Sequence, residues 1–319
     1  MTRRTRRIIF YFFLIFFIIV VPIIIFYAWG YGFDWEEKAM VATGGIYLRS
    51  YPTKAQVYIN DKPEGKTNRF IRRLIPKSYD LKVVKEDYHP WQKTLLVEPK
   101  MVSKANTILL VPFNPKIFLV ASDSEEYLSF KTPDKKDNLY YISNNNLYTS
   151  KTSKILVKNV INYAIYKDGI IYLDNLTGKI FELDLTSLKS APFFEQVFPS
   201  FNQGKWILSS DNKKLLCQKD KSVEILWLDN VANNSLIRKK GDIEKIDFGQ
   251  PINEVIWYPR TDEHLIIATD NSILITELDS RPPRNTTNFI STEKPQIKYD
   301  SKPQTLYFLS QGKLYQTEL

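Results

Sequence analysis

The longest uninterrupted hydrophobic stretch runs from Ile8 to Trp29, 22 residues without a charged or amide side chain. A helix of that length rises about 33 Å, enough to cross a hydrocarbon core of about 30 Å. A lone segment in lipid must satisfy its own backbone hydrogen bonds, so a helix is expected even with Pro22 inside it. The pattern therefore predicts a transmembrane helix over residues 8–29.

Over residues 44–113 the pattern changes to short runs in which apolar and polar residues alternate. Ile46 and Leu48, and then Val57 and Ile59, are spaced two residues apart, as in strands that bury one face. Polar turn residues separate these runs. The region is therefore expected to form a small β domain.

From residue 116 to the C-terminus, a unit of strand, polar turn, strand, short turn and strand recurs five times. The middle strands begin about 42 residues apart on average, at Leu139, Ile170, Leu215, Leu265 and Leu306. Such a period is typical of four-stranded propeller blades. We expect the fourth strands in less patterned stretches, such as residues 195–201 or 243–250. A β-sandwich or an irregular stack of meanders is the alternative.

The charge flanking the hydrophobic segment predicts its orientation. Four arginines precede it, whereas residues 31–37 hold three acids and no Lys or Arg. Basic flanks stay in the cytoplasm, so the N-terminus is expected inside and the remaining chain outside. The aromatic residues expected at the outer interface are Tyr27, Trp29, Tyr31 and Trp35.

A cleaved signal peptide is the alternative, because it too begins with basic residues and an apolar core. Ala28 and Gly30 could serve as the small residues before a cleavage site. The apolar run is longer than the roughly 7–15 residues usual for such a core, which favours an anchor.

Residues 44–113 resemble a PEGA domain, a small β-sandwich-like module of bacterial and archaeal envelope proteins. The residues that carry the resemblance are Ser50, Pro52, Ala55, the run Val57-Tyr58-Ile59-Asn60, Gly65, Thr67, Tyr79 and Tyr88. Asn68, Ser78 and Asp87 depart from the residues usual in the family. The resemblance implies a structural or interaction module and brings no catalytic residues.

Trp257-Tyr258-Pro259, followed by Asp262 and a hydrophobic strand, resembles the WD40-like repeats of TolB-type propellers. The other copies carry turn acids at Asp134, Asp168, Asp211 and Asp300. A turn Asp is also expected simply because its carboxylate accepts nearby backbone N–H groups. The resemblance is therefore to the repeat architecture and implies no particular ligand.

Composition narrows the chemistry. The net charge is +9, and four of these units belong to the arginines that precede the hydrophobic segment. The remaining charge, about +5, is scattered along the chain and forms no basic stripe. Nucleic acid is therefore not an expected partner. The single cysteine, Cys217, excludes an intramolecular disulfide and a multi-cysteine metal site. It is expected to be an ordinary strand residue.

Candidate catalytic residues are few. His89 and His264, the two histidines, are expected in surface turns, and no G-x-S-x-G motif or glycine-rich phosphate loop occurs. The acids at strand ends, which could in principle converge in a propeller channel, are Glu182, Asp184, Asp229, Glu277 and Asp279. The aromatics expected in blade cores rather than in a sugar-binding platform are Trp206, Trp227, Trp257 and Tyr258. We predict no catalytic, cofactor-binding or metal-binding residue and no cofactor.

The sequence thus predicts an all-β exterior behind one N-terminal transmembrane helix. Pro112 and Pro115 mark the boundary between its two domains, since proline cannot donate to a β ladder. The expected parts are a cytoplasmic basic arm (1–7), the transmembrane helix (8–29), a juxtamembrane stalk that extends the helix or acts as a linker (30–43), a PEGA-like β-sandwich (44–113) and a β-propeller-like repeat domain (116–319).

The function expected from these parts is that of a single-pass cell-membrane protein with an outward-facing scaffold or binding domain. Its partners would be the lipid bilayer, through residues 8–29, and an envelope protein or polysaccharide recognised by the propeller-like domain. The alternative is a propeller-type extracytoplasmic hydrolase acting on glycans or peptides. The residues that line the propeller axis would distinguish a binding protein from a hydrolase.

Overall fold

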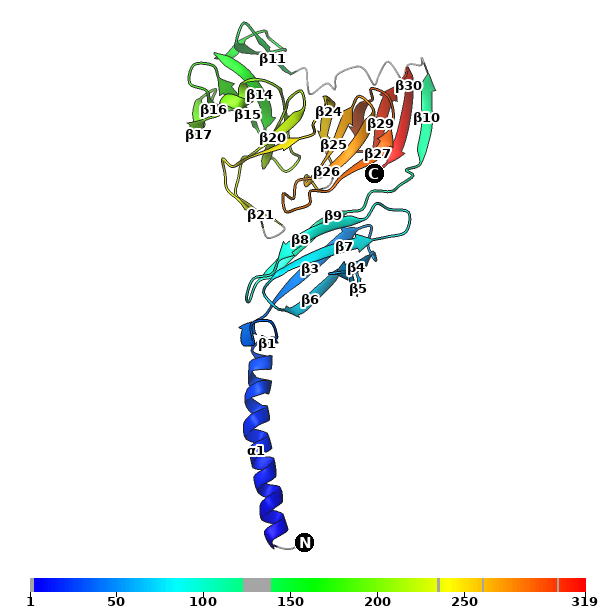
Figure 1. Cartoon of the computed structure of the whole chain (residues 1–319). Coiled ribbons are helices and arrows are strands. Elements are labelled where there is room, and N and C mark those ends of the chain that lie inside the picture. Colours follow the sequence, from blue (N-terminus) through cyan, green and yellow to red (C-terminus); the bar gives the residue numbers. More distant parts are fainter. Residues whose placement is uncertain (1–2, 123–138, 234–235, 260, 303) are drawn as a thin grey trace. The chain divides into compact units, whose positions relative to one another are not determined.

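A computed structural model describes residues 3–122, 139–233, 236–259, 261–302 and 304–319. The chain forms two compact units (Figure 1). The first comprises Met1–Leu110 with Arg281–Pro283, and the second comprises Val111–Ser280 with Arg284–Leu319. Apart from one N-terminal helix and a short 3-10 turn, the regular structure described is β-strand, which confirms the all-β fold class.

The N-terminal helix α1 (Arg3–Ala28) covers residues 8–28 of the predicted segment; it begins five residues before that segment and ends one residue before its end. It is long and apolar enough to cross a membrane, and none of its residues is buried by the rest of the chain. Pro22 lies inside the helix without ending it. An apolar helix whose residues are not buried by protein is suited to lipid.

The segment after α1 forms a β-hairpin, so the helix does not extend through residues 30–43, which was one of the two forms expected for the stalk. Strands β1 (Tyr31–Asp34) and β2 (Ala39–Ala42) pair antiparallel. At the base of the hairpin, Thr43 donates both its backbone N–H and its hydroxyl to the Gly30 carbonyl, at 2.9 and 2.7 Å. A strand of four residues is too short to give a clear alternation in the sequence.

A two-sheet β-sandwich follows in the same unit. Its strands are β3 (Gly44–Tyr51), β4 (Gln56–Ile59), β5 (Lys62–Lys66), β6 (Arg69–Leu74), β7 (Ser78–Val84), β8 (Trp91–Leu96) and β9 (Val102–Leu109). One sheet has the order β6-β3-β9, with β9 parallel to β3, and the other has the order β5-β4-β7-β8. Ile46, Leu48, Val57 and Ile59, the predicted inward positions, are at most 6% exposed in the core between them.

The second unit consists of consecutive antiparallel sheets (Figure 1). Its first strands are β10 (Ile117–Ser122), β11 (Tyr140–Ser143), β12 (Asn146–Thr149), β13 (Ile155–Lys158), β14 (Val160–Tyr166), β15 (Gly169–Asp174), β16 (Lys179–Asp184) and β17 (Ser190–Val197), followed by the 3-10 turn η1 (Pro199–Asn202). The next are β18 (Lys205–Leu208), β19 (Lys214–Gln218), β20 (Ser222–Trp227), β21 (Val231–Asn233), β22 (Leu236–Arg238) and β23 (Ile243–Asp247). The last are β24 (Ile252–Trp257), β25 (His264–Thr269), β26 (Ser272–Glu277), β27 (Thr286–Ser291), β28 (Gln296–Asp300), β29 (Thr305–Ser310) and β30 (Lys313–Glu318).

The sheet orders are those of propeller blades. Four sheets have four strands each: β14-β15-β16-β17, β18-β19-β20-β23, β24-β25-β26-β27 and β28-β29-β30-β10. The sheet with the described order β11-β12-β13 comes first along the chain, so the sheets that begin with β14, β18, β24 and β28 are the second to fifth. Strands β21 and β22 form a hairpin inserted between β20 and β23. β14 packs against β18 and β24 against β28, so first strands of neighbouring sheets lie together. Pairing of β10 with β30 joins the two ends of this unit.

The predicted repeat agrees with these sheets. Each predicted middle-strand start lies within one residue of the start of β11, β15, β19, β25 or β29. A fourth strand occurs at β23, as expected, whereas the stretch 195–201 is only partly strand because β17 ends at Val197 and η1 follows. Asp134 and much of the first copy lie outside the described residues.

A buried polar cluster ties the third sheet to the fourth. The carboxylate of Asp262 accepts hydrogen bonds from the Ser210 hydroxyl at 2.6 Å and the Asp211 backbone N–H at 3.0 Å. Lys214, whose side chain is 2% exposed, lies 3.2 Å from Glu263 and 3.4 Å from Asp211. Asp262, the turn acid identified in the sequence, therefore lies in its own turn and also bonds to the neighbouring sheet.

Replacing Asp262 by Ala should destabilise the second unit by roughly 2 kcal/mol, because the Ser210 hydroxyl and the Asp211 N–H both lose a buried charged acceptor. Asp300→Ala is the matched control: Asp300 is exposed and its carboxylate accepts the Lys302 N–H of its own turn. Its replacement should cost at most about 0.5 kcal/mol. Thermal or urea unfolding of the full chain in detergent measures both variants, and equal losses would contradict a bond between sheets.

Candidate functional site

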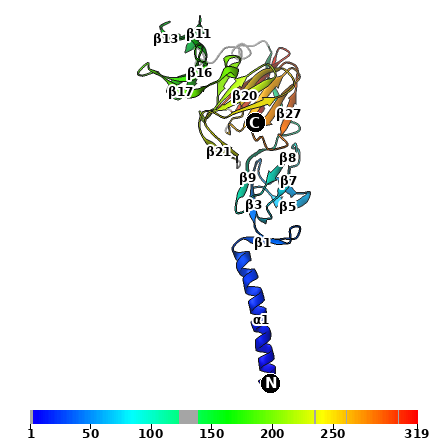
Figure 2. The ribbon, with the colours of Figure 1, turned by 60° about the vertical axis from the view of Figure 1, so that its left-hand side comes forward.

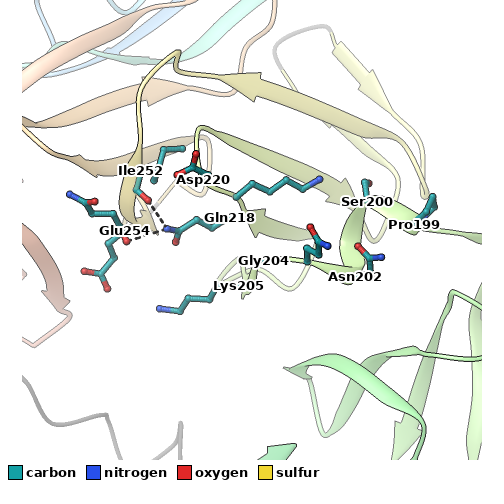
Figure 3. Close-up of a pocket in the computed structure, with 12 residues that line it drawn as sticks. Pro199, Ser200, Asn202, Gly204, Lys205, Gln218, Asp220, Ile252 and Glu254 are labelled. Atoms are coloured by element: carbon teal, nitrogen blue, oxygen red, sulfur yellow. Dashed lines mark hydrogen bonds between the residues drawn. The ribbon is translucent and has the colours of Figure 1, made fainter. Parts of the chain in front are cut away.

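A pocket of about 750 Å³ lies in the propeller-like unit (Figure 3). Three connections meet there: the turn before β18, the turn between β19 and β20, and the start of β24. The lining residues are Pro199, Ser200, Asn202, Gln203, Gly204, Lys205, Gln218, Lys219, Asp220, Ile252, Asn253 and Glu254. Because strands alternate in direction, these connections emerge at the same end of the third and fourth sheets.

Buried aromatics hold the first wall of the pocket. The rings of Phe194, Phe198, Phe201 and Trp206 contact one another edge to face in sequence, with centroids 4.9, 6.0 and 6.1 Å apart. The Trp206 indole N–H donates to the Phe201 carbonyl at 3.1 Å. This packing holds η1 in place and leaves its polar side chains at the pocket.

Gly204 closes this wall at a position that no other residue could occupy without movement. Its φ is +108°, and a Cβ there would lie 2.2 Å from the Gln218 carbonyl oxygen. The left-handed conformation and the close approach both require glycine. The Asn162 side chain donates to the Gly204 carbonyl at 2.7 Å, so the wall is also tied to the preceding sheet.

Gln218 joins the two sheets at the bottom of the pocket. Its side-chain nitrogen donates to the carbonyls of Ile252 and Asn253, at 3.3 and 3.2 Å (Figure 3). The Ile252 backbone N–H in turn donates to the Asp220 carbonyl at 2.6 Å. These bonds hold the second and third walls together, so the described pocket is formed by backbone that is largely fixed.

A β-bulge at the start of β24 places Glu254 in the pocket. The pairing of β24 with β25 shifts by one residue between Ile252 and Glu254, which leaves Asn253 as the extra residue. The Glu254 carboxylate accepts the Ile297 backbone N–H at 2.9 Å. Burial raises the pKa of Glu254 above its ordinary value, while the Ile297 N–H and the charge of Lys205 act to lower that pKa.

The chemistry of the lining is polar and electrically balanced. Four amide side chains and a serine hydroxyl offer donors and acceptors, and the two lysines match the two carboxylates of Asp220 and Glu254. Lys219 also forms an ion pair with Glu224 at 2.6 Å. Such a lining can form many hydrogen bonds and has no strong preference for either sign of charge.

The strand-end acids singled out in the sequence lie elsewhere. None of the five lines this pocket; Glu277 and Asp279 are buried, and Glu277 accepts two hydrogen bonds from Asn285, at 2.6 and 2.8 Å. Asp220 and Glu254 were missed, since neither belongs to a motif. The only sequence signal was an acid two residues after Ile252, at a position where alternation predicts an apolar side chain.

The histidines and the cysteine give no catalytic group in this pocket. His264 is the first residue of β25 and is buried, so its prediction as a surface turn residue is wrong; His89 is half-buried beside the turn before β8. Burial raises the pKa of Cys217 to about 11, and the thiol donates to the Gln203 carbonyl at 3.1 Å. In the described part of the chain, no group of three or more His, Cys, Asp or Glu residues could hold a metal ion.

Comparison with known proteins identifies the sandwich. Residues 43–109 match the PEGA domain, which confirms the resemblance seen in the sequence. No curated protein resembles the chain closely enough to count as a match.

Several solved structures are similar to the chain at low identity. An auxiliary nutrient binding protein from Bacteroides ovatus is 9% identical, with 86% of this chain and 97% of that chain covered and a TM-score of 0.34. An oligogalacturonate lyase in complex with manganese is 13% identical, with 54% of this chain and 55% of that chain covered and a TM-score of 0.39. An oligogalacturonate lyase from Vibrio parahaemolyticus is also 13% identical, with 52% of each chain covered and a TM-score of 0.36. The chain thus spans about half the length of these lyases. Likenesses this weak carry no information on what the chain binds.

Replacing Glu254 by Gln should stabilise the protein at neutral pH. Because the folded-state pKa of Glu254 lies above the ordinary value of 4.5, this carboxyl favours folding while protonated. That contribution is present below pH 4.5 and is lost as the pH rises through the folded-state pKa. The melting temperature of Glu254→Gln should therefore exceed that of the parent at pH 7–8, and the difference should shrink toward pH 4.

Glu195→Gln is the matched control, because the Glu195 side chain is 86% exposed. It should change the melting temperature little at any pH. A Glu254→Gln difference that grows toward acid pH would contradict the assigned sign.

Proposed function

We propose that the chain is a membrane-anchored, outward-facing binding protein of the cell envelope. Its propeller-like unit binds a neutral, hydroxyl-rich polymer, such as a polysaccharide, in the pocket between the third and fourth sheets. The observation that carries the proposal is the polar, charge-balanced lining of a pocket of about 750 Å³. That volume is within the range of about 300–1,000 Å³ usual for ligand sites.

The kind of lining favours a ligand with many hydroxyl groups. Most ligand pockets are lined mainly by apolar and aromatic side chains, but here Pro199 and Ile252 are the apolar side chains of the lining. The amide side chains of Asn202, Gln203 and Asn253 are exposed at the pocket. An amide offers both donors and an acceptor, and a hydroxyl group can pair with either. A polysaccharide supplies such groups at regular spacing.

The charges favour a neutral ligand over a polyanion. Lys205 and Lys219 are matched by Asp220 and Glu254, so the pocket does not present the excess of positive charge that a polyanion would need. Binding should therefore depend little on salt.

A protein partner fits the same pocket less well. The centres of protein interfaces are enriched in Trp, Tyr and Arg, and none of these lines the pocket. An extended polymer can reach polar groups in a concave site without a large apolar contact area.

The alternative is a hydrolase acting on glycans or peptides. The observation that favours it is the presence of two carboxyl groups, Asp220 and Glu254, in one pocket, with burial raising the pKa of Glu254. A carboxyl group with a raised pKa can serve as a general acid, and a second carboxylate can act as base or nucleophile. The Ile297 N–H bonded to Glu254 supports a structural role instead.

Full-length protein in lipid nanodiscs should bind at least one of four defined probes: chitotetraose, cellotetraose, mannotetraose or tetragalacturonate. A neutral probe should bind more tightly than tetragalacturonate and should stay bound in 0.5 M salt, where the Debye length is only about 4 Å. Asn202→Ala and Lys205→Ala should each weaken binding by about tenfold, or 1.4 kcal/mol. Calorimetry or biolayer interferometry measures the affinities.

Lys213→Ala is the control for Lys205→Ala, since Lys213 is exposed in the turn at the opposite ends of β18 and β19. It should leave affinity unchanged. No saturable binding to any probe, or equal losses in both lysine variants, would overturn the proposed site. Cleavage of a probe that stops in Asp220→Asn or Glu254→Gln would establish the hydrolase instead.

The proposed orientation has its own test. In intact cells that express the chain, external protease should remove an epitope at Leu319 and spare one at Met1, because the four N-terminal arginines hold that end inside. Replacing Arg3, Arg4, Arg6 and Arg7 by Glu should produce inverted or mixed insertion. A C-terminal epitope protected in the parent chain would contradict the orientation.

A further inference from the structure

The β1–β2 hairpin has one face packed on the sandwich and one face left open. A Cβ at Gly32 would lie 2.9 Å from a methyl carbon of Thr43 and 3.3 Å from one of Ile75, so the Gly32 face lies against the first unit. Phe33 and Met40 are opposite each other on the other face. They are 41% and 44% exposed, and Trp35 in the turn is 82% exposed.

The open face is built from apolar residues in contact with one another. Tyr31 and Phe33 alternate with Gly32 and Asp34 along β1, so they point to the same side. The rings of Phe33 and Trp35 lie 4.8 Å apart, and the Tyr31 ring contacts Phe26 of α1 at 5.8 Å. The apolar surface of the helix is therefore continuous with that of the hairpin.

Chain length keeps this face close to the end of α1. Two residues separate Ala28 from Tyr31, so the two Cα atoms lie at most about 11 Å apart. Figures 1 and 2 both show the hairpin at the end of α1, between the helix and β3 of the same unit. The interfacial layer of a bilayer is about 5–8 Å thick on each side, so the base of the hairpin must meet it if α1 spans the hydrocarbon core.

We propose that residues 31–42 form a membrane-surface anchor whose Phe33, Trp35 and Met40 side chains insert into the interfacial layer of the outer leaflet. The inference rests on the proposed insertion of α1. Amphipathic helices at membrane surfaces bury their apolar face about 5–10 Å into the boundary between headgroups and acyl chains, and the apolar face of the hairpin is placed to make the same kind of contact. The hairpin thereby adds a second membrane contact, which limits tilting of the sandwich about the end of the helix.

Charge identifies the lipid chemistry that this contact accepts. The hairpin holds Asp34, Glu36, Glu37 and Lys38, a net charge of −2. The cations beside it, Arg73 over the Tyr27 ring, Lys77 and Lys100 over the Tyr31 ring, offset this charge. With so little net charge, anionic headgroups add little attraction. Glu36 is also paired with Lys77 at 3.2 Å. The occupant of the open face is thus a zwitterionic or neutral lipid surface.

The test places an NBD fluorophore at single cysteines of the full-length chain in phosphatidylcholine nanodiscs, in a Cys217→Ala background. Met40→Cys reports the open face, and Ala39→Cys, its exposed neighbour in β2, reports the other face. Lipids with a nitroxide near the headgroup end of the acyl chain should quench the probe at residue 40 severalfold more than that at residue 39. Adding phosphatidylglycerol should not increase quenching.

Two further probes separate failure of this inference from failure of the membrane anchor. Ile15→Cys, in the middle of α1, should be quenched strongly by deep nitroxides, and Lys189→Cys, exposed in the second unit, should not be quenched. Strong quenching at Ile15 with equal, weak quenching at residues 39 and 40 would overturn the hairpin anchor alone. An unquenched Ile15 probe would overturn both proposals.

Substitutions within the hairpin complete the test. The double variant Phe33→Ser/Trp35→Ser should reduce quenching at residue 40 to the level of Lys189 while Ile15 stays quenched. The matched variant Glu36→Ser/Glu37→Ser changes neighbouring exposed residues and should leave quenching at residue 40 unchanged. Equal effects of the two double variants would show that the aromatic side chains are not what holds the hairpin at the surface.

Discussion

The propeller-like unit depends on the burial of middle strands on both faces at once. Every residue of β20 and β25 is buried, and so is nearly every residue of β15 and β19. A four-stranded sheet cannot bury both faces by itself, so each sheet needs neighbours to cover it. Polar groups buried between neighbouring sheets need partners. Lys214 accordingly pairs with Asp211 and Glu263, and Asp262 bonds to the preceding sheet.

The same constraint determines where a ligand can bind. Strands that are buried on both faces expose no side chains to solvent. A ligand can therefore reach only the ends of the strands and the connections between them. The pocket lies there, between the ends of two sheets, and its walls come from an aromatic-supported turn, a glutamine that crosses between the sheets and a β-bulge. The apolar side chains are buried in the sheets, so mainly polar side chains remain at the strand ends that line the pocket.

Much of the fold could be predicted because it depends on periodic burial. The 22-residue apolar run, the period-two strands of the sandwich and the repeat of about 42 residues each reflect one environment sustained over many positions. Features that depend on contacts between distant residues could not be read in this way. His264 is buried because a neighbouring element covers it, and Asp262 bonds to residues about 50 positions away.

The candidate site was less predictable than the fold, for two physical reasons. Glu254 reaches the pocket through a bulge, and a one-residue shift in pairing reverses which face a side chain occupies. The hairpin of residues 31–42 was missed because each strand has four residues and one contains Gly32, so alternation had no length in which to appear. A site built from turns, bulges and short strands has no period.

The proposed membrane anchor and the proposed polymer-binding pocket differ in how strongly each has to hold its partner. A helix of about 20 apolar residues inserts effectively irreversibly, and a surface contact by a few aromatics only restrains its direction. A single polar pocket gains little apolar burial, so its intrinsic affinity for one segment of polymer is expected to be weak. A polymer, however, presents the same segment many times, and a protein confined to a membrane meets it at high effective concentration. Weak binding by each pocket is then sufficient for lasting association, and it also allows the protein to move along the polymer.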